Sequence, residues 1–195
     1  MCIRDRDRAA ALVAKRAAGQ FVQHFPEFEA AGKGLYLWSE TQGSGKTTLA
    51  AGIGNALIRH CKRQVRYIGS IELLNAIRSS FRSRDEQPKL LDEASEFKVL
   101  ILDDLGAERP TDWVQEQFYE LMNARMTRKL VTIITSNNGP DDLSLDARTR
   151  SRIKALTMPI HLPEEDVRSQ ISVGVNDGLA ELLYGPEDGG HQRPI

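Results

Sequence analysis

The feature that most constrains the fold of this chain is a regular alternation of short apolar runs with segments of helical periodicity. The intervening segments carry apolar residues at helical spacing, as at Leu49, Ile53 and Leu57. Strands that alternate with helices form a parallel sheet with right-handed crossovers. The sequence therefore predicts an α/β fold with five strands. The apolar runs are residues 35–38, 65–68, 99–102, 131–134 and, more weakly, 158–162.

Length and composition indicate one globular domain. The chain has 195 residues, of which 41% are hydrophobic and 27% charged, and this balance is typical of a single domain with an apolar core. The net charge of -1 provides no overall field that would hold the chain on nucleic acid or on an anionic membrane. Any contact with DNA must therefore be local.

Cysteine content and hydropathy indicate the compartment. Only Cys2 and Cys61 are present, too few for a disulfide framework or a zinc site, which favours a reducing cytosol. No apolar run approaches the ~20 residues that a membrane span needs, and the first residues lack the apolar segment of a signal peptide. We therefore expect a cytoplasmic protein without membrane contact.

The chain divides into four segments. Residues 1–8 read MCIRDRDR, which looks like translated adapter sequence, so we set them aside as an artefact or disordered start; whether this start is authentic stays open. Residues 9–31 predict an alanine-rich lead-in helix that Pro26 interrupts. Residues 32–184 carry the alternating strands and helices of the main domain. Residues 185–195, rich in Gly and Pro, predict a flexible tail.

A glycine-rich loop, ETQGSGKTTLA at residues 40–50, stands between the first predicted strand and the first strong helix. Gly43 and Gly45 let backbone N–H groups turn toward an anion, and the following helix adds its positive N-terminal end. Lys46 is placed to bridge β and γ phosphates, and Thr47 to ligate Mg²⁺. The loop therefore predicts a nucleoside triphosphate site. Its binding residues are Gly43, Ser44, Gly45, Lys46, Thr47 and Thr48.

The loop departs from the usual GxxxxGKT pattern at its first position, where Glu40 replaces glycine. A carboxylate beside a triphosphate is repulsive, unless Ser39 takes the turn and Glu40 points to solvent. A chance GSGKT in an unrelated loop is the alternative, and the strand before and helix after argue against it. The effect of Glu40 on ATP affinity stays open.

Polar residues follow two later strands of the predicted sheet. Asp103 and Asp104 follow residues 99–102, and the carboxyl ends of parallel strands open onto the ligand crevice. We predict that Asp103 holds the Mg²⁺ water shell and that Asp104 orients or deprotonates an attacking water. Asn137, after residues 131–134, is predicted to reach the γ phosphate or that water. The alternatives are a solvated acidic turn and an ordinary Asn-rich turn.

Six segments give the chain a specific resemblance to AAA+ helicase loaders of the DnaC, DnaI and IstB type. It extends over residues 9–171 and implies a three-layer P-loop NTPase fold with strand order 5-1-4-3-2, an ATPase domain at residues 32–184 and a very short C-terminal lid. It also implies ATP and Mg²⁺ as cofactors. The implied partners are a DnaB-like replicative helicase, single-stranded DNA and further copies of the chain. The segments, in family order, are GLYLW, GSGKTTLA, LILDDLGAE, NARM, TSN and RTRSRI.

The same resemblance assigns roles to late arginines. Arg152 looks like the arginine finger, which acts in the ATP site of a neighbouring subunit. Arg168 looks like the second sensor arginine, which acts in its own subunit. Arg148 stands one helical turn before Arg152 on the same face. For Arg148 and Arg150 a solvated basic face is an equal alternative.

The segment AIRSSFRSR lies where loaders carry an extra helix for single-stranded DNA. Arg78, Arg82 and Arg84 can neutralise phosphates, and Phe81 can stack on a base. Helical spacing of Phe81 with the apolar residues before it favours a core position instead.

Function classes other than a helicase loader stay open. An IstB-like transposition helper shares the same ATPase, and neighbouring genes would separate the two. A nucleotide-gated adaptor that does not hydrolyse ATP is kept open by Glu40 and by Asp104, where many AAA+ proteins place Glu. A small-molecule kinase is disfavoured, because the acidic pair and the late arginine favour attack by water.

Overall fold

The computed structural model describes residues 3–80, 89–109 and 111–168. The predicted DNA contacts of Phe81, Arg82 and Arg84, the short C-terminal lid and the tail of residues 185–195 lie outside this part. Among the described helices, none combines the length and apolar character that crossing a membrane requires.

A five-stranded parallel sheet lies at the centre of the domain, in the order β2-β3-β4-β1-β5. Counted from its other edge, this is the predicted order 5-1-4-3-2, which is confirmed. The central strand β4 is buried at every residue, as expected for a parallel strand with neighbours on both sides and helices on both faces. The strands are β1 (Gly34–Trp38), β2 (Val65–Gly69), β3 (Val99–Leu105), β4 (Val131–Ser136) and β5 (Thr157–His161).

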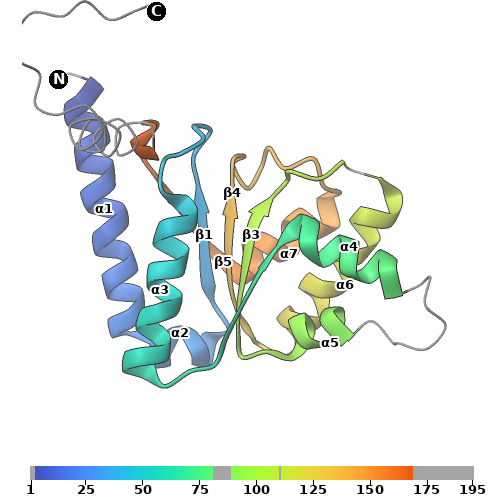
Figure 1. Ribbon diagram of the computed structural model, residues 1–195. Coiled ribbons are helices and arrows are strands. Elements are labelled where there is room, and N and C mark those ends of the chain that lie inside the picture. The colour runs from blue at the N-terminus through green and yellow to red at the C-terminus, as the bar shows by residue number, and fades with distance from the viewer. Residues whose placement is uncertain (1–2, 81–88, 110, 169–195) are drawn as a thin grey trace, which may run out of the picture.

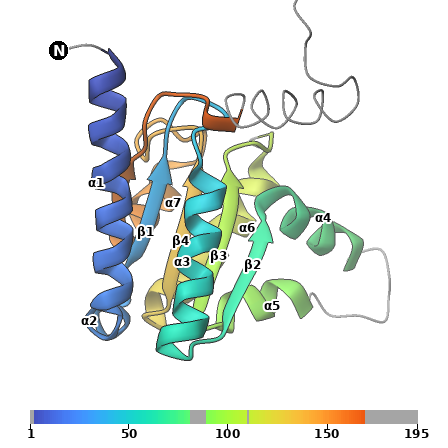
Figure 2. The ribbon, with the colours of Figure 1, turned by 60° about the vertical axis from the view of Figure 1, so that its left-hand side comes forward.

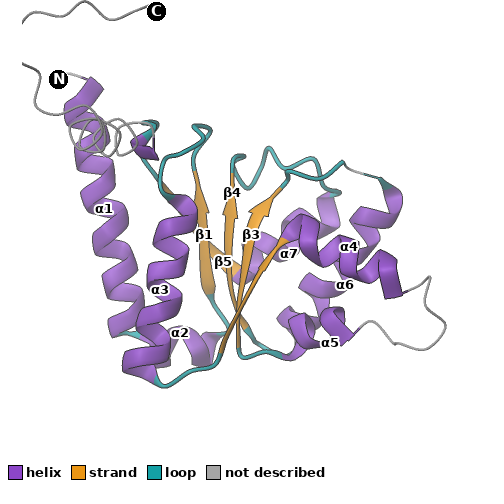
Figure 3. Ribbon diagram, in the orientation of Figure 1, coloured by secondary structure: helices purple, strands orange, loops and turns teal. Residues whose placement is uncertain are grey.

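Helices cover both faces of the sheet, so the domain has three layers (Figure 1 and Figure 3). The helices are α1 (Ile3–Gln23), α2 (Phe25–Ala31), α3 (Lys46–Cys61), α4 (Ser70–Ser80), α5 (Lys89–Glu96), α6 (Asp112–Thr127) and α7 (Ala147–Leu156). Two of them, α1 and α3, lie side by side over one face, as the turned view in Figure 2 also shows, and α4, α6 and α7 lie over the other. Leu35 and Leu37 of β1 belong to the core under α1 and α3, whereas Tyr36 belongs to the opposite core. This alternation is the period of a strand that is buried on both faces.

The lead-in segment forms two helices, and Pro26 begins the second rather than breaking the first. The first helix, α1, begins at Ile3, within the residues set aside above, and ends at Gln23. Pro26 lies in the first turn of α2, where its missing N–H has no helical partner to lose. The break therefore falls at His24, before the proline.

Arg125, in the NARM segment, is completely buried and joins three elements. Its guanidinium donates to the Thr132 hydroxyl of β4 at 2.8 Å and to the carbonyl oxygens of Ala94, Phe97 and Val131 at 2.6–3.0 Å. Burial lowers its pKa to about 9. All its partners are neutral, so hydrogen bonds alone stabilise this cation between α5, α6 and β4.

Gly34 brings β1 so close to β4 that no side chain fits. A Cβ there would lie 1.8 Å from the Thr132 carbonyl oxygen, so Gly34→Ala must push the two strands apart. We expect a loss of about 1–3 kcal/mol or more in the free energy of unfolding, measured by chemical denaturation. Gly19→Ala in α1 is the matched control, because nothing lies within 4 Å of that position; it should stabilise by about 0.5–1 kcal/mol. Equal stability of Gly34→Ala and wild type would contradict the close approach.

Candidate nucleotide-binding site

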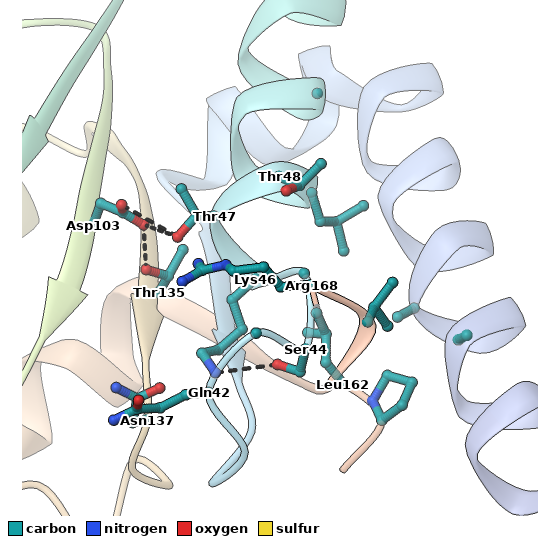
Figure 4. A pocket seen from close by; sticks show the side chains of 18 of the residues that line it. Gln42, Ser44, Lys46, Thr47, Thr48, Asp103, Thr135, Asn137, Leu162 and Arg168 are labelled. Atoms are coloured by element: carbon teal, nitrogen blue, oxygen red, sulfur yellow. Dashed lines mark hydrogen bonds between the residues drawn. The ribbon is translucent and has the colours of Figure 1, made fainter. Parts of the chain in front are cut away.

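A cavity of about 790 Å³ lies at the carboxyl edge of the sheet (Figure 4). The glycine-rich loop, the ends of β3 and β4, helix α1 and the segment after β5 surround it. Every predicted site residue except Arg152 lines this cavity. These lining residues are Gly43, Ser44, Gly45, Lys46, Thr47, Thr48, Asp103, Asp104, Asn137 and Arg168.

The loop has the backbone shape that binding of an anion requires. Gly43 and Gly45 have φ angles of 79° and 91°, in the left-handed region that glycine adopts without steric cost. Gly45 is also the N-cap residue of α3, so the unpaired N–H groups of the first helical turn lie beside the cavity. A Cβ on Gly43 would lie 2.0 Å from Oδ1 of Asp166. The cradle thus depends on glycine at both positions.

Lys46 is only 8% exposed and lies against its own loop. Its Nζ donates to the carbonyl oxygens of Ser39 and Thr41, at 3.1 and 2.8 Å, and to the Ser44 hydroxyl at 3.1 Å. Burial lowers the pKa of Lys46, while the carboxylates of Glu164 and Asp104 act in the opposite direction. The three partners are neutral, so a bound phosphate would supply this ammonium with a direct counter-charge.

Glu40 is exposed and does not line the cavity. The Glu40 carboxylate therefore points to solvent and does not lie beside the site of a triphosphate. Glu40, which replaces the first glycine of the usual pattern, therefore does not obstruct the phosphate-binding loop.

Thr47 and Asp103, the predicted Mg²⁺ ligands, lie in direct contact. The Thr47 hydroxyl is 3.1 and 3.3 Å from the two Asp103 carboxylate oxygens, and Figure 4 shows both side chains facing the cavity. The described residues contain no cluster of three or more His, Cys, Asp or Glu side chains suited to a metal. One carboxylate and one hydroxyl fit Mg²⁺, which takes its other ligands from phosphates and water.

The acidic pair lies within β3, which corrects the strand end predicted at Leu102. Leu102 is opposite Ile134 of β4, but Leu105 is opposite Ser136, so β3 carries one extra residue in a bulge. Asp104 has a φ of 57°. In a regular strand two consecutive side chains point to opposite faces, whereas here both aspartates line one cavity. Aspartates are rare in strands, which is why the sequence pattern predicted an earlier end.

The bulge also brings Asp104 to the predicted polar sensor. Nδ2 of Asn137 donates to Oδ1 of Asp104 at 3.3 Å. The Thr135 hydroxyl accepts from the Asp104 N–H at 2.8 Å and lies 2.5 Å from Oδ1 of Asp103. Thr135 thus fixes both acidic residues, a role that its place in a run of turn-forming residues did not indicate.

Beside the acidic pair lies a half-buried carboxyl group, that of Glu108, which ends the LILDDLGAE segment and to which the sequence assigned no role. Glu108 accepts hydrogen bonds from the Ser70 hydroxyl at 2.9 Å and the Gly106 N–H at 3.2 Å. Ser70 also lies 2.8 Å from the Asp104 carbonyl oxygen. Burial raises the pKa of Glu108. These contacts connect the start of α4 to the backbone at Asp104.

Helix α1 forms a wall of the cavity, which its reading as a lead-in helix did not predict. Ala11, Ala14 and Lys15 face the cavity from α1, opposite Leu49 and Gly52 of α3. The two alanines are three residues apart and so share one face of the helix. Small residues on both helices, the two alanines of α1 and Gly52 of α3, therefore line this part of the cavity.

Two arginines of α7, Arg148 and Arg152, contact α6 and do not line the cavity. Arg152 donates from Nε to Oδ1 of Asn123 at 3.0 Å and from Nη2 to the Tyr119 hydroxyl at 2.9 Å. Its guanidinium carbon lies 4.2 Å from the Tyr119 ring centroid, and that of Arg148 lies 5.0 Å away. Arg148 and Arg152 therefore share a face, as predicted. Arg150 instead donates to the carbonyl oxygens of residues 143 and 145 and is half-buried, so the solvated-face alternative is wrong for it.

Arg168 lies at the other side of the cavity, after β5. Its side chain lines the cavity, and Figure 4 shows it beside the phosphate loop. Its backbone N–H donates to the Gly43 carbonyl oxygen at 3.2 Å. The two arginines that the sequence singled out thus lie in different places, Arg168 at the cavity and Arg152 away from it.

Fold and site together define a P-loop ATPase fold of the AAA+ type. The chain belongs to the family described as the bacterial DnaA ATPase domain, whose family model matches residues 9–158. The predicted likeness to DnaC- and DnaI-type proteins is confirmed by the relatives and solved structures that follow.

Among curated relatives, the replicative helicase loader DnaI of Bacillus subtilis strain 168 is 32% identical over 153 residues, 70% of this chain and 48% of the loader. The chromosomal replication initiator DnaA of Latilactobacillus sakei strain 23K is 29% identical over 182 residues, 92% of this chain and 38% of the initiator. The chain thus spans about half the length of these relatives or less.

Among solved structures, a crystal structure of DnaI has a TM-score of 0.66 at 34% identity and covers 78% of this chain and 84% of its own. A crystal structure of the DnaC helicase loader also has a TM-score of 0.66, at 24% identity, covering 75% of this chain and 86% of its own. The second similarity supports the fold alone.

Proposed function

We propose that this chain binds and hydrolyses ATP with Mg²⁺ and uses the cycle to load a DnaB-like replicative helicase on single-stranded DNA. The observation that carries the proposal is the convergence of Lys46, Thr47, Asp103, Asp104 and Asn137 on one cavity. The similarity to the replicative helicase loader DnaI supports the choice of partner. The cytosol is the compartment in which such a loader would act.

Binding follows from the charges and shapes on the cavity wall. Bound ATP with Mg²⁺ would supply the phosphoanhydride that is cleaved and the charge compensation that cleavage needs. Lys46 and the loop N–H groups would hold the β and γ phosphates, and Thr47 with Asp103 would hold the metal. The part of the cavity lined by Ala11 of α1 and Gly52 of α3 would take the adenine ring.

Hydrolysis requires a group that orients and deprotonates water. Asp104 faces the cavity and accepts a hydrogen bond from Asn137, so the two side chains can hold a water molecule for attack on the γ phosphate. The Thr135 hydroxyl accepts a hydrogen bond from the Asp104 N–H and so keeps the backbone at Asp104 in place. Arg168 supplies positive charge from the same subunit.

Arg152 would complete the site of a neighbouring copy. Its guanidinium is held on α6 by Asn123 and Tyr119, outside the cavity of its own chain. A fixed arginine at the surface of α7 suits action between subunits, where it would offset charge that develops on the phosphate in the transition state.

The proposal is tested by ATP hydrolysis with and without single-stranded DNA. We expect slow turnover by the wild type that DNA accelerates, and an Arg152→Ala variant that keeps its ATP affinity but loses most of the DNA-stimulated turnover, by roughly 10³-fold for a complete arginine finger. Mixing Arg152→Ala with Lys46→Ala protein should restore part of the activity, because one variant offers an intact pocket and the other an intact finger. Absence of ATP binding by the wild type would contradict the function, and absence of rescue would contradict the shared site.

A further inference from the structure

The segment after β5 is tied to the first residues of the phosphate loop. One carboxylate, that of Glu164, accepts the backbone N–H of Glu40 at 3.0 Å and that of Thr41 at 2.7 Å. The Ser39 hydroxyl lies 3.0 Å from the same carboxylate and 3.1 Å from the Pro163 carbonyl oxygen, and its single hydrogen is donated to one of these two acceptors at a time. A single side chain thus binds three consecutive residues at the point where the loop leaves β1.

This contact falls where the loop lacks its usual first glycine. Glu40 occupies that position without a positive φ, since Lys62, Asp104 and Lys129 are the non-glycine residues with positive φ in the described part. Its side chain is exposed, so only its backbone takes part in the loop. The turn at Glu40 and Thr41 is therefore stabilised from outside, by a carboxylate that binds two successive N–H groups.

Glu164 is itself held in position. His161 Nε2 lies 2.7 Å from Glu164 Oε1, and the His161 ring stacks on Trp38, the last residue of β1, with centroids 4.2 Å apart. Partial burial by itself raises the pKa of Glu164, but hydrogen bonds from Thr41, His161 and Glu40 hold it at about 2. The carboxylate is ionised at neutral pH and makes charge-assisted hydrogen bonds.

We infer that Glu164 is a positioning residue that shapes the phosphate loop in place of the absent glycine. The same short segment carries Arg168, whose N–H donates to the Gly43 carbonyl oxygen at 3.2 Å. The segment after β5 therefore contacts the phosphate loop at two places, through Glu164 and through Arg168. The part of this inference that concerns ATP affinity rests on the proposed function, whereas the part that concerns loop structure does not.

Electrostatics and positioning predict opposite effects of removing this charge. The Glu164 carboxylate raises the pKa of Lys46, and a negative charge near that ammonium also repels a bound triphosphate. By charge alone, Glu164→Gln should strengthen ATP binding. If Glu164 shapes the loop, the same substitution should weaken ATP binding. Glutamine keeps one acceptor oxygen but replaces the other with an NH₂ group, so one of the two backbone N–H groups loses its acceptor. The sign of the change decides between them.

The test compares Glu164→Gln with Glu40→Gln, which removes a carboxylate from the same loop but none of its hydrogen bonds. In ligand-free protein, hydrogen exchange of at least one of the Glu40 and Thr41 amides should be roughly tenfold faster in Glu164→Gln, and that of both should be unchanged in Glu40→Gln. Affinity for a non-hydrolysable ATP analogue should fall roughly tenfold or more in Glu164→Gln and rise slightly in Glu40→Gln. His161→Phe keeps a ring on Trp38 but loses the bond to Glu164, so it should give a smaller change in the same direction and serves if Glu164→Gln does not fold.

The outcomes separate the two proposals. Unchanged exchange at Glu40 and Thr41 overturns the positioning role, and so does an ATP affinity that rises or stays the same in Glu164→Gln. A wild type that binds no nucleotide, with faster exchange in Glu164→Gln, overturns the proposed function while the loop-shaping role stands.

Discussion

Replacing Asp104 by Asn is expected to stop ATP hydrolysis and leave ATP binding intact. The carboxylate faces the cavity and is the group placed to take a proton from water, whereas Asn cannot do so. General base catalysis contributes about 10²–10⁴-fold, so turnover should fall by about that factor. Asn also tolerates the positive φ of this position, so the loss should not come from misfolding. Turnover is measured by phosphate release and binding by titration of an ATP analogue.

A matched control separates this effect from loss of a surface charge. Asp92→Asn removes a carboxylate from the exposed surface of α5 and should hydrolyse ATP at the wild-type rate. If Asp104→Asn also kept the wild-type rate, Asp104 would not be the base.

Replacing Lys46 by Ala is expected to abolish ATP binding at micromolar nucleotide. Lys46 is the buried cation of the phosphate cradle and has only neutral partners. Each hydrogen bond to a charged group contributes about 1.5–3 kcal/mol, so losing two phosphate contacts should weaken binding by at least about 100-fold. Isothermal titration with ATP and Mg²⁺ measures the change.

Lys98→Ala is the control for Lys46→Ala, since Lys98 is exposed and directly precedes β3, at the edge of the sheet opposite the cavity. It should bind ATP as the wild type does. Comparable affinities of Lys46→Ala and Lys98→Ala would show that the cavity is not a triphosphate site.

The fold was predictable because its signals are local. Alternating apolar runs and helical segments indicated five parallel strands, and the resemblance supplied their order. The glycine-rich loop before α3 and the polar residues after β4 were also local patterns, and the structure brings Lys46, Asp103 and Asn137 to one cavity.

The rest of the site depends on contacts between distant residues. Glu164 binds Glu40 from 124 positions away, and no periodicity or motif connects the two. Ala11 and Ala14 form a wall of the cavity because α1 packs beside α3. The alanine-rich sequence of α1 does not specify that packing. Contacts between residues far apart in the sequence are decided by tertiary packing, and the local sequence pattern does not determine that packing.

The backbone at Asp104 bears on the presence of an aspartate where many AAA+ proteins place a glutamate. With φ at 57°, this position favours glycine and, among the other residues, Asn and Asp, whose short polar groups are well tolerated in that conformation. Aspartate is the acid among them. The shorter carboxylate is therefore the acidic side chain that suits the main-chain geometry of this position.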